Sequence, residues 1–356
     1  MTMPLSRPAD GTAVDPLTRV LAAQGHRVVF SSDGGEPSLT AVGGQLRGYA
    51  RTGRTAEAAA VELRFAGSDE RRPFLAEGLD VTAGSSVRIV PVYASGEREW
   101  FSVIEVDPGE PTGPWRVRLF ERSGGRGKLL ASHESHAHMA GTQIRRVYEQ
   151  NGEVAIIRLR GSIYAVVGGR VLVLEGPGED AGRFAETSDP DCPPNKRCYP
   201  LPAEIDAKCV LGAAPGGRSF VMADEGKILR RDTSTGATVA SSYENFFYTG
   251  IVEDDAVVLA HAGEPPFVKR WSAAAPQGQL LVAGPIYVQL ARSSGGTLYG
   301  VSREGALDRL VDGRAVGVVT LPAGFRVVAV AAADKVAFVV ASDATPPMYS
   351  VVVAGP

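Results

Sequence analysis

One strand pattern recurs along this chain at nearly regular intervals, and that recurrence constrains its fold more than any other feature. Each copy is a short apolar strand, a tight turn that contains glycine, and a second strand. Clear copies begin at Gly161 (G-S-I-Y-A-V-V-G-G-R-V-L-V-L-E), Gly217 and Gly296, and looser copies with a longer turn begin at Asp255 and Lys335. Because the apolar runs are short and are bounded by Gly, Pro, Asp and Ser, they predict antiparallel hairpins in an all-β protein.

The spacing of the copies indicates a repeat. The fourth residues of the copies are Tyr164, Phe220, Val258, Tyr299 and Phe338, which are 56, 38, 41 and 39 positions apart. The last three intervals match the period of roughly 40 residues of a four-stranded repeat unit. The excess in the first interval falls on residues 176–202, which we therefore predict to be a loop insertion.

Further hairpins are expected around Phe101 and Tyr49, which brings the number of units to seven, with six or eight as alternatives. A four-stranded unit cannot bury both of its faces alone, so the units must stack in a ring whose two ends join. The chain ends in the strand Y-S-V-V-V, and the segment H-R-V-V-F-S from His26 is the expected partner that completes the last sheet. The one helix that the pattern favours covers Pro16 to Gln24.

With these repeats, the chain resembles β-propeller repeat proteins of the broad WD40-like or quinoprotein-like kind, most clearly over residues 160–356. It lacks the Gly-His and Trp-Asp pairs of WD40 repeats, and the Asp-x-x-Thr-Gly turn of quinoprotein repeats occurs once, at Asp232. The resemblance implies a β-propeller and no narrower family. We expect one propeller over residues 1–356; the alternative is a β-sandwich over 1–135 and a smaller propeller over 136–356.

The charge balance argues against polyanionic partners. The 356 residues include 37 basic and 40 acidic side chains, for a net charge of −3, so neither nucleic acid nor a membrane surface is the expected partner. The N-terminus lacks the pattern of a secretory signal, and no apolar run reaches the roughly 18 residues of a spanning helix. We expect a cytoplasmic protein; a secreted or periplasmic one is the alternative if a leader has been removed.

Three of the five histidines lie in S-H-E-S-H-A-H, residues 132–138. In an extended strand Glu134, His136 and His138 share one face, and together they could hold zinc with a position open for water. Calcium held by acidic loops such as V-E-D-D-A from Val252 is a second metal to consider. The favoured interpretations are a solvated connector for the histidines and ordinary turns for the acidic loops, with no cofactor.

The cysteines leave two alternatives open. Cys192 and Cys198 lie six positions apart in a proline-containing loop and could form a disulfide, which would close a short ring. In a cytoplasmic protein these thiols, together with Cys209, would be reduced. A zinc site would need a fourth ligand that this pattern lacks.

The segment Y-E-N-F-F-Y-T-G, from Tyr243, is the best candidate for binding. Its aromatic residues Tyr243, Phe246, Phe247 and Tyr248 cannot all be buried on one face of a strand, since three of them are consecutive. Exposed aromatic side chains often anchor protein partners; the alternative is that they pack between sheets. The expected function is a non-catalytic platform that binds a protein or peptide through loops at one face of the ring, without catalytic residues. The alternative is a metal-dependent hydrolase or lactonase with its site in the central tunnel.

Overall fold

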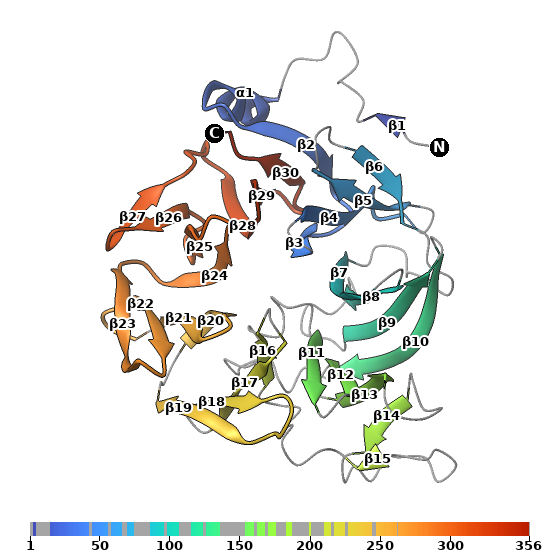
Figure 1. The fold of residues 1–356 in the computed structure, drawn as a ribbon. Helices are drawn as coiled ribbons and strands as arrows, with labels where there is room; N and C mark the ends of the chain where they lie inside the picture. Colours follow the sequence, from blue (N-terminus) through green and yellow to red (C-terminus); the bar gives the residue numbers. More distant parts are fainter. Residues whose placement is uncertain are drawn as a thin grey trace.

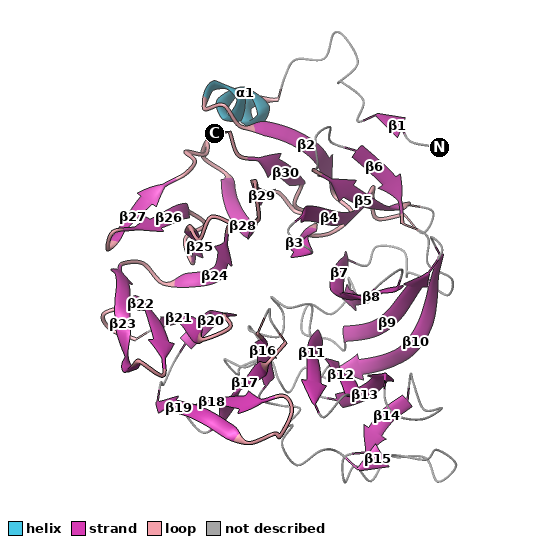
Figure 2. Ribbon diagram, in the orientation of Figure 1, coloured by secondary structure: helices cyan, strands magenta, loops and turns pink. Residues whose placement is uncertain are grey.

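The computed structural model describes nineteen stretches of the chain. They are residues 3–4, 15–42, 45–55, 58–65, 70–74, 86–95, 98–106, 115–123, 126–135, 154–159, 162–167, 170–175, 183–186, 199–200, 210–214, 217–224, 227–243, 247–261 and 263–355. Within these stretches the chain forms one helix and thirty strands (Figure 2). The described strands make up seven sheets, which we number along the chain.

Sheets 1 to 3 are built from the first half of the chain. Sheet 1 contains β1 (Met3–Pro4), β3 (Ser38–Val42), β4 (Gln45–Arg51), β5 (Ala60–Arg64) and β6 (Glu70–Pro73). Sheet 2 contains β7 (Ser86–Ser95), β8 (Arg98–Val106), β9 (Trp115–Ser123) and β10 (Arg126–Ser135). Sheet 3 contains β11 (Val154–Leu159), β12 (Ser162–Val167), β13 (Arg170–Glu175), β14 (Arg183–Glu186) and β15 (Tyr199–Pro200).

Sheets 4 to 7 follow the same plan. Sheet 4 contains β16 (Val210–Ala213), β17 (Ser219–Asp224), β18 (Lys227–Asp232) and β19 (Thr238–Tyr243). Sheet 5 contains β20 (Phe247–Val252), β21 (Ala256–His261), β22 (Phe267–Ser272) and β23 (Ala275–Ala283). Sheet 6 contains β24 (Tyr287–Arg292), β25 (Leu298–Ser302), β26 (Leu307–Val311) and β27 (Arg314–Gly317). Sheet 7 contains β28 (Phe325–Ala332), β29 (Val336–Ser342), β30 (Tyr349–Val353) and the early strand β2 (Arg27–Ser32).

The sheets stand around a centre, each with one strand toward the middle (Figure 1). The inner strands β3, β7, β11, β16, β20, β24 and β28 each contact the next, and β28 contacts β3 again. The ring is therefore closed, and the fold is a β-propeller, as the resemblance implies. Two short strands of the predicted insertion at 176–202, β14 and β15, add to the outer side of sheet 3; the rest of that segment lies outside the described residues.

The residues that mark the repeat in the sequence occupy the same position in every sheet. All seven residues that mark the repeat lie in the second strand of their sheets: Tyr49, Phe101, Tyr164, Phe220, Val258, Tyr299 and Phe338. The second strand of a four-stranded unit is covered by a neighbouring strand on each side, so it carries the most continuous apolar run. This is why the sequence marks that strand more clearly than the others.

Alternate side chains of these strands pack into two different cores. In β29, Ala337 and Val339 pack with sheet 1, while Phe338 and Val340 pack with sheet 6. In β21, Val257 and Leu259 likewise face sheet 4, and Val258 and Ala260 face sheet 6. Because both faces of each sheet are buried, the strands are apolar at successive positions and do not alternate between apolar and polar residues.

The N-terminal region completes the last sheet. β2 pairs antiparallel with β30 in a register that places Val28 opposite Val352 and Ser31 opposite Ser350, which confirms the partner that the sequence predicts. Without β2, the backbone groups of β30 would form an open sheet edge. The predicted helix is also present, as α1 (Pro16–Ala23), and its Leu17 and Leu21 are buried against sheets 6 and 7.

Hydrogen bonds fix the chain between α1 and β2. The side-chain amide of Gln24 donates to the carbonyl oxygen of Thr320 at 2.8 Å and accepts from its N–H at 2.8 Å. His26 is 8% exposed; its imidazole accepts from the N–H of Gly355 at 3.0 Å and lies 3.2 Å from the carbonyl oxygen of Val318. His26 is thus a hydrogen-bonded packing residue next to β2.

Sheet 1 shares its core with sheet 7. Leu46, Val61 and Phe65 pack in the same buried cluster as Val339 and Val351. In addition, Nζ of Lys335 donates to the carbonyl oxygen of Phe65 at 2.8 Å. We propose on this basis that residues 1–356 form one propeller, because a separate sandwich over residues 1–135 would have to give up these contacts.

Sheets 1 and 2 are joined through a buried ionic network. Glu62, whose side chain is 2% exposed, pairs with Arg122 at 3.1 Å and with Arg64 at 3.0 Å. Glu99 pairs with Arg47 at 2.7 Å and also with Arg122. The guanidinium of Arg122 lies 4.7 Å from the centre of the Phe101 ring. Burial, together with the charge of Glu62, raises the pKa of Tyr49 beside this network, so its hydroxyl keeps its proton.

Candidate functional site

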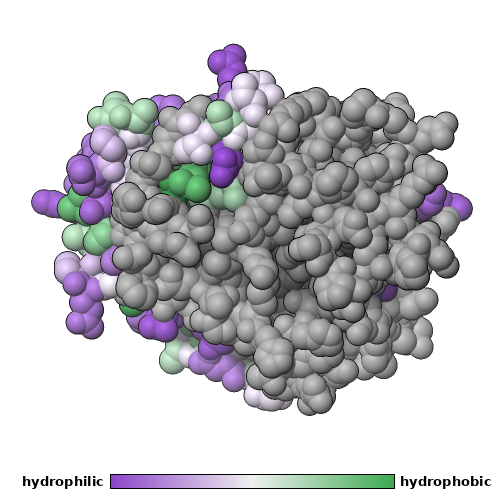
Figure 3. Space-filling view, turned by 90° about the horizontal axis from the view of Figure 1, so that it is seen from below, coloured by the Kyte–Doolittle hydropathy of each residue, from purple (hydrophilic) through white to green (hydrophobic). Residues whose placement is uncertain are grey.

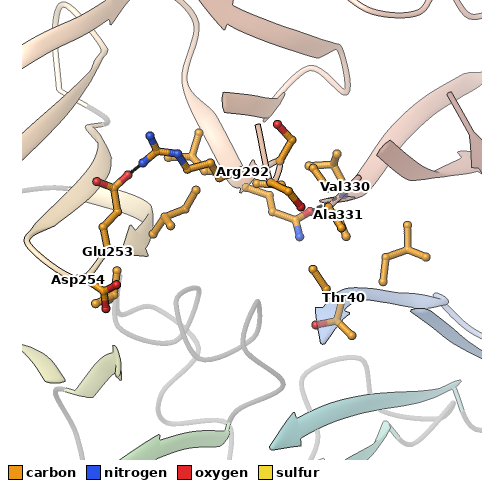
Figure 4. Close-up of a pocket in the computed structure, with 17 residues that line it drawn as sticks. Thr40, Glu253, Asp254, Arg292, Val330 and Ala331 are labelled. Carbon is orange, nitrogen blue, oxygen red and sulfur yellow. Dashed lines mark hydrogen bonds and ion pairs between the residues drawn. The ribbon is translucent and has the colours of Figure 1, made fainter. Parts of the chain in front are cut away.

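A cavity of about 580 Å³ opens where the inner strands of four sheets end. Its walls come from the inner strands β3, β20, β24 and β28 and from the residues that follow the last three (Figure 4). Parallel inner strands bring their carboxyl ends to the same face of the ring, so residues that are distant in sequence meet there. We call this cavity the mouth of the ring. Its volume lies within the range of ordinary ligand pockets, about 300 to 1,000 Å³.

An acidic turn borders the mouth on the sheet 5 side. Glu253, Asp254 and Asp255 connect β20 to β21, and the N–H of Glu253 donates to the carbonyl oxygen of Ala256 at 2.8 Å. The side chain of Glu253 is 10% exposed and that of Asp255 is 76% exposed. This acidic loop is therefore a hairpin turn between β20 and β21.

Three arginines from three consecutive sheets converge on this turn. Arg230 comes from β18 in sheet 4, Arg270 from β22 in sheet 5, and Arg292 from the end of β24 in sheet 6. Nε of Arg270 donates to Glu253 Oε2 at 2.9 Å, and its Nη2 donates to Asp255 Oδ1 at 2.9 Å. Arg292 pairs with the other carboxylate oxygen of Glu253 (Figure 4). The acidic charge of Glu253 is therefore held between two guanidinium groups.

Arg230 binds the backbone of the turn. Its guanidinium donates to the carbonyl oxygens of Glu253 at 2.9 Å, Asp254 at 2.8 Å and Ala256 at 2.5 Å, and to the hydroxyl of Ser219 at 2.6 Å. Burial lowers the pKa of Arg230, against the opposing effect of Asp255 and Asp254. Arg230 thus ties the turn of sheet 5 to sheet 4.

Other bonds connect the remaining walls of the mouth. The side-chain oxygen of Gln289 in β24 accepts from the N–H of Val330 in β28 at 3.0 Å. The N–H of Ser294 donates to the carbonyl oxygen of Ala333 at 2.9 Å. Sheets 6 and 7 are therefore joined at the edge of the cavity, and its shape is fixed by bonds between sheets.

Around the rim of the ring the described surface is mixed, with hydrophilic and hydrophobic side chains next to one another (Figure 3). The large hydrophobic side chains that are exposed in the described part of the chain come from three different strands and from the loop before β30: Leu129, Leu280, Val316 and Met348. The described residues contain no helix that is both long and apolar enough to cross a membrane.

The structure places the aromatic segment at the other face of the ring. Tyr243 ends the outer strand β19, and Phe247 and Tyr248 begin the inner strand β20; Phe246 lies outside the described residues. Since the acidic turn follows the last residue of β20, the aromatic segment and the mouth are at opposite ends of that strand. Contact of this segment with a partner stays a prediction.

The predicted metal and disulfide residues are not brought together by the described structure. Glu134 lies in β10, the outer strand of sheet 2, opposite Arg116, whereas His136, His138, Cys192 and Cys198 lie outside the described residues. Among the residues that are described, no group of three or more His, Cys, Asp or Glu side chains could hold a metal ion. The zinc or calcium site and the disulfide therefore stay predictions, and metal analysis of a His136→Ala, His138→Ala variant would test the first.

The mouth is not apparent from the sequence. The acidic segment from Val252 is visible there, but its contacts with Arg230, Arg270 and Arg292 are not, because these arginines come from separate repeats. A signal is nevertheless present, since each arginine lies in or at the end of a strand and the three strands occupy adjacent repeat units.

No model of a known protein family matches the sequence, and no curated protein does. The chain resembles WD40 β-propeller domains. The WD40 domain of Pan2 from Neurospora crassa is 11% identical over 90% of this chain and 88% of that domain, with a TM-score of 0.49. The WD40 β-propeller domain of Doa1 is 7% identical over 92% of this chain and 97% of that one, with a TM-score of 0.47. A Pyrococcus horikoshii acylaminoacyl peptidase matches 71% of this chain and 43% of its own, at 10% identity and a TM-score of 0.40.

Proposed function

We propose that this protein is a non-catalytic binding platform that holds a peptide segment of a protein partner at the mouth of the ring. The observation that carries the proposal is the cavity of about 580 Å³ formed by the inner strands of four sheets. The cavity combines small apolar residues, such as Ala331 and Ala333, with polar groups of Thr40, Gln289 and Arg292. Such a mixture suits a peptide, which offers both backbone hydrogen-bonding groups and side chains.

The rigidity of the walls supports the same function. Arg230 joins sheet 4 to sheet 5, the Arg292–Glu253 pair joins sheet 5 to sheet 6, and the Gln289 and Ser294 bonds join sheet 6 to sheet 7, so the walls are fixed before any partner arrives. A preformed site avoids part of the entropy cost of ordering loops on binding. The ring therefore supplies a fixed surface, and the partner supplies the flexible segment.

A peptide selection tests this function. The purified full chain is screened against a display library of random 12-residue peptides, and the selected peptides are then measured with a Thr40→Trp variant. Thr40 lines the mouth, so a tryptophan there should reduce binding about tenfold or more by filling the space. Ala344→Trp is the matched control, because Ala344 is exposed in the loop between β29 and β30, at the opposite end of sheet 7 from the mouth. Equal binding by both variants would exclude the mouth as the site.

The aromatic segment and the predicted insertion at 176–202 are further candidate contacts of the platform. A Phe246→Ala, Phe247→Ala variant tests the aromatic segment separately, because this segment lies at the other end of β20 from the mouth. Loss of partner capture by this variant, with binding unaffected in Thr40→Trp, would move the binding site to the opposite face of the ring.

A further inference from the structure

At the mouth, the side-chain acceptors of Glu253 and Gln289 already have hydrogen-bond or ion-pair partners. Both carboxylate oxygens of Glu253 are already paired, one with Arg270 and one with Arg292. The side-chain oxygen of Gln289 is also used, because it accepts from the N–H of Val330. The side-chain acceptors of these two residues are therefore occupied before a ligand binds.

The side-chain donors of Arg292, Gln289 and Thr40, which also line the mouth, are largely available. Arg292 has five N–H donors, and its one ion pair with a described residue is the contact of Nη1 with Glu253. Its side chain is 41% exposed. Among the described residues, Gln289 uses only its side-chain oxygen, which is bonded to Val330, so both N–H groups of its amide are available there. Thr40, across the cavity on β3 (Figure 4), adds a hydroxyl donor.

Asp254 also lines the mouth, at the acidic turn, whereas the part of the wall formed by Arg292, Gln289 and Thr40 presents donors. Such donors favour a ligand rich in acceptors, and a carboxylate meets this need best because charge-assisted hydrogen bonds are the strongest. A guanidinium can bind two carboxylates at once through different N–H groups, so Arg292 can keep Glu253 and still take a second carboxylate. The buried floor of Val330, Ala331 and Ala333 leaves room for the apolar part of an acidic side chain.

We infer that the mouth selects peptides that carry an acidic residue, whose carboxylate binds Arg292 with support from Gln289 and Thr40. This inference rests on the proposed function, because it names the chemistry of the segment that the platform binds. It also gives Arg292 a role in specificity beyond its ion pair with Glu253.

The test uses an array of 12-residue peptides of random sequence. Each sequence is made in three versions that differ only in the central residue, which is Glu, Gln or Lys. Binding is measured for the full chain and for the Arg292→Gln variant. Arg326→Gln is the matched control, because Arg326 is an exposed arginine that pairs with Asp343 at 3.0 Å at the opposite end of β28. We expect the Glu peptides to bind best, to lose about tenfold or more in affinity with Arg292→Gln, and to be unaffected by Arg326→Gln.

A second pair of variants does not alter the ion pair of Glu253. Thr40→Asp adds a carboxylate to the wall of the mouth and should reduce binding of the Glu peptides more than that of the Lys peptides, while Thr40→Asn should not discriminate between them. Urea unfolding of each variant verifies that the fold is intact.

The outcomes separate the two proposals. Peptides could bind at the mouth without a preference for Glu, or with a preference that Arg292→Gln leaves unchanged. Either result would overturn the inference about acidic residues but would leave the proposed function, a peptide-binding platform, in place. If Thr40→Trp does not weaken the binding of any peptide in the array, then both the inference and the proposed function are wrong.

Discussion

The backbone N–H of Gly355 donates a hydrogen bond to Nδ1 of His26 at 3.0 Å, although the two residues are 329 positions apart. This bond lies beside the pairing of β2 with β30 and fixes the two ends of the propeller to each other. Since Nδ1 accepts, the proton of the neutral ring is on Nε2, which faces the carbonyl oxygen of Val318. His26 thus uses both ring nitrogens to hold the closure of the ring.

Replacing His26 with alanine should destabilise the protein by about 2 to 4 kcal/mol, because two partly buried backbone groups lose their partner and the edge-to-face contact of the imidazole with the Phe338 ring is removed. Urea unfolding measures the loss. His261→Ala is the control: His261 is partly exposed and accepts from the nearby N–H of Gly263, so its replacement should cost less than about 1 kcal/mol. Equal effects of the two variants would show that the closure does not depend on His26.

Arg230→Met should destabilise the protein by about 2 to 4 kcal/mol, because three carbonyl oxygens of the acidic turn lose a charged donor. The same variant should weaken peptide binding at the mouth, because the turn is no longer held to sheet 4. Arg231→Met is the adjacent control, since Arg231 donates to the carbonyl oxygen of Gly236 at 3.2 Å, away from the mouth. An Arg230→Met protein with normal stability and binding would contradict this role.

Glu62→Ala should cost about 3 to 5 kcal/mol of stability, because it removes a buried carboxylate from the ionic network and takes one of two carboxylate partners from the buried Arg122. Glu70→Ala removes a comparable pair with Arg72, in which both side chains are well exposed, and should cost no more than about 1 kcal/mol. Chemical denaturation of both variants compares the two positions. A small effect at Glu62 would mean that the network between sheets 1 and 2 is not closed as described.

Glu99 should make stability depend on pH. Burial alone would raise its pKa, but hydrogen bonds from Arg47 and Arg122 hold the pKa of the folded protein below the ordinary 4.5. The lower folded value means that the stabilisation is present above pH 4.5 and is lost as the pH falls through the folded pKa. The difference in unfolding free energy between the wild type and Glu99→Gln should therefore shrink below about pH 4.5. A difference that stays constant down to pH 3 would argue against these bonds.

The sequence predicts much of this fold because its signals are local. Phe338, Val258 and the other marker residues lie in short apolar runs between turns, so the second strand of each unit and the phase of the repeat can be identified without knowing how the sheets stack. The pairing of the His26 segment with the last strand follows from a general need, which is to avoid an open edge in a closed ring.

The candidate site is harder to predict because it depends on stacking. Arg230, Arg270 and Arg292 meet Glu253 or its turn only because sheets 4, 5 and 6 lie side by side. Nothing in the local pattern of each strand indicates which arginine points to the turn. For the same reason the aromatic segment that looked most promising for binding lies at the opposite end of β20 from the cavity, a relation that composition cannot reveal.

The central claim is that one ring spans the chain and is closed by β2 and β30, and a cross-link between these strands tests it most directly. Ser31 and Ser350 face each other in the register, and their hydroxyl oxygens are 2.9 Å apart. In a Ser31→Cys, Ser350→Cys protein whose native cysteines are replaced by serine, mild oxidation should give a nearly complete intramolecular disulfide, identified by mass spectrometry of the peptides. The cross-linked protein should also unfold at a higher urea concentration than its reduced form. Absence of the disulfide in the folded protein, or a disulfide only between two molecules, would contradict the closed ring.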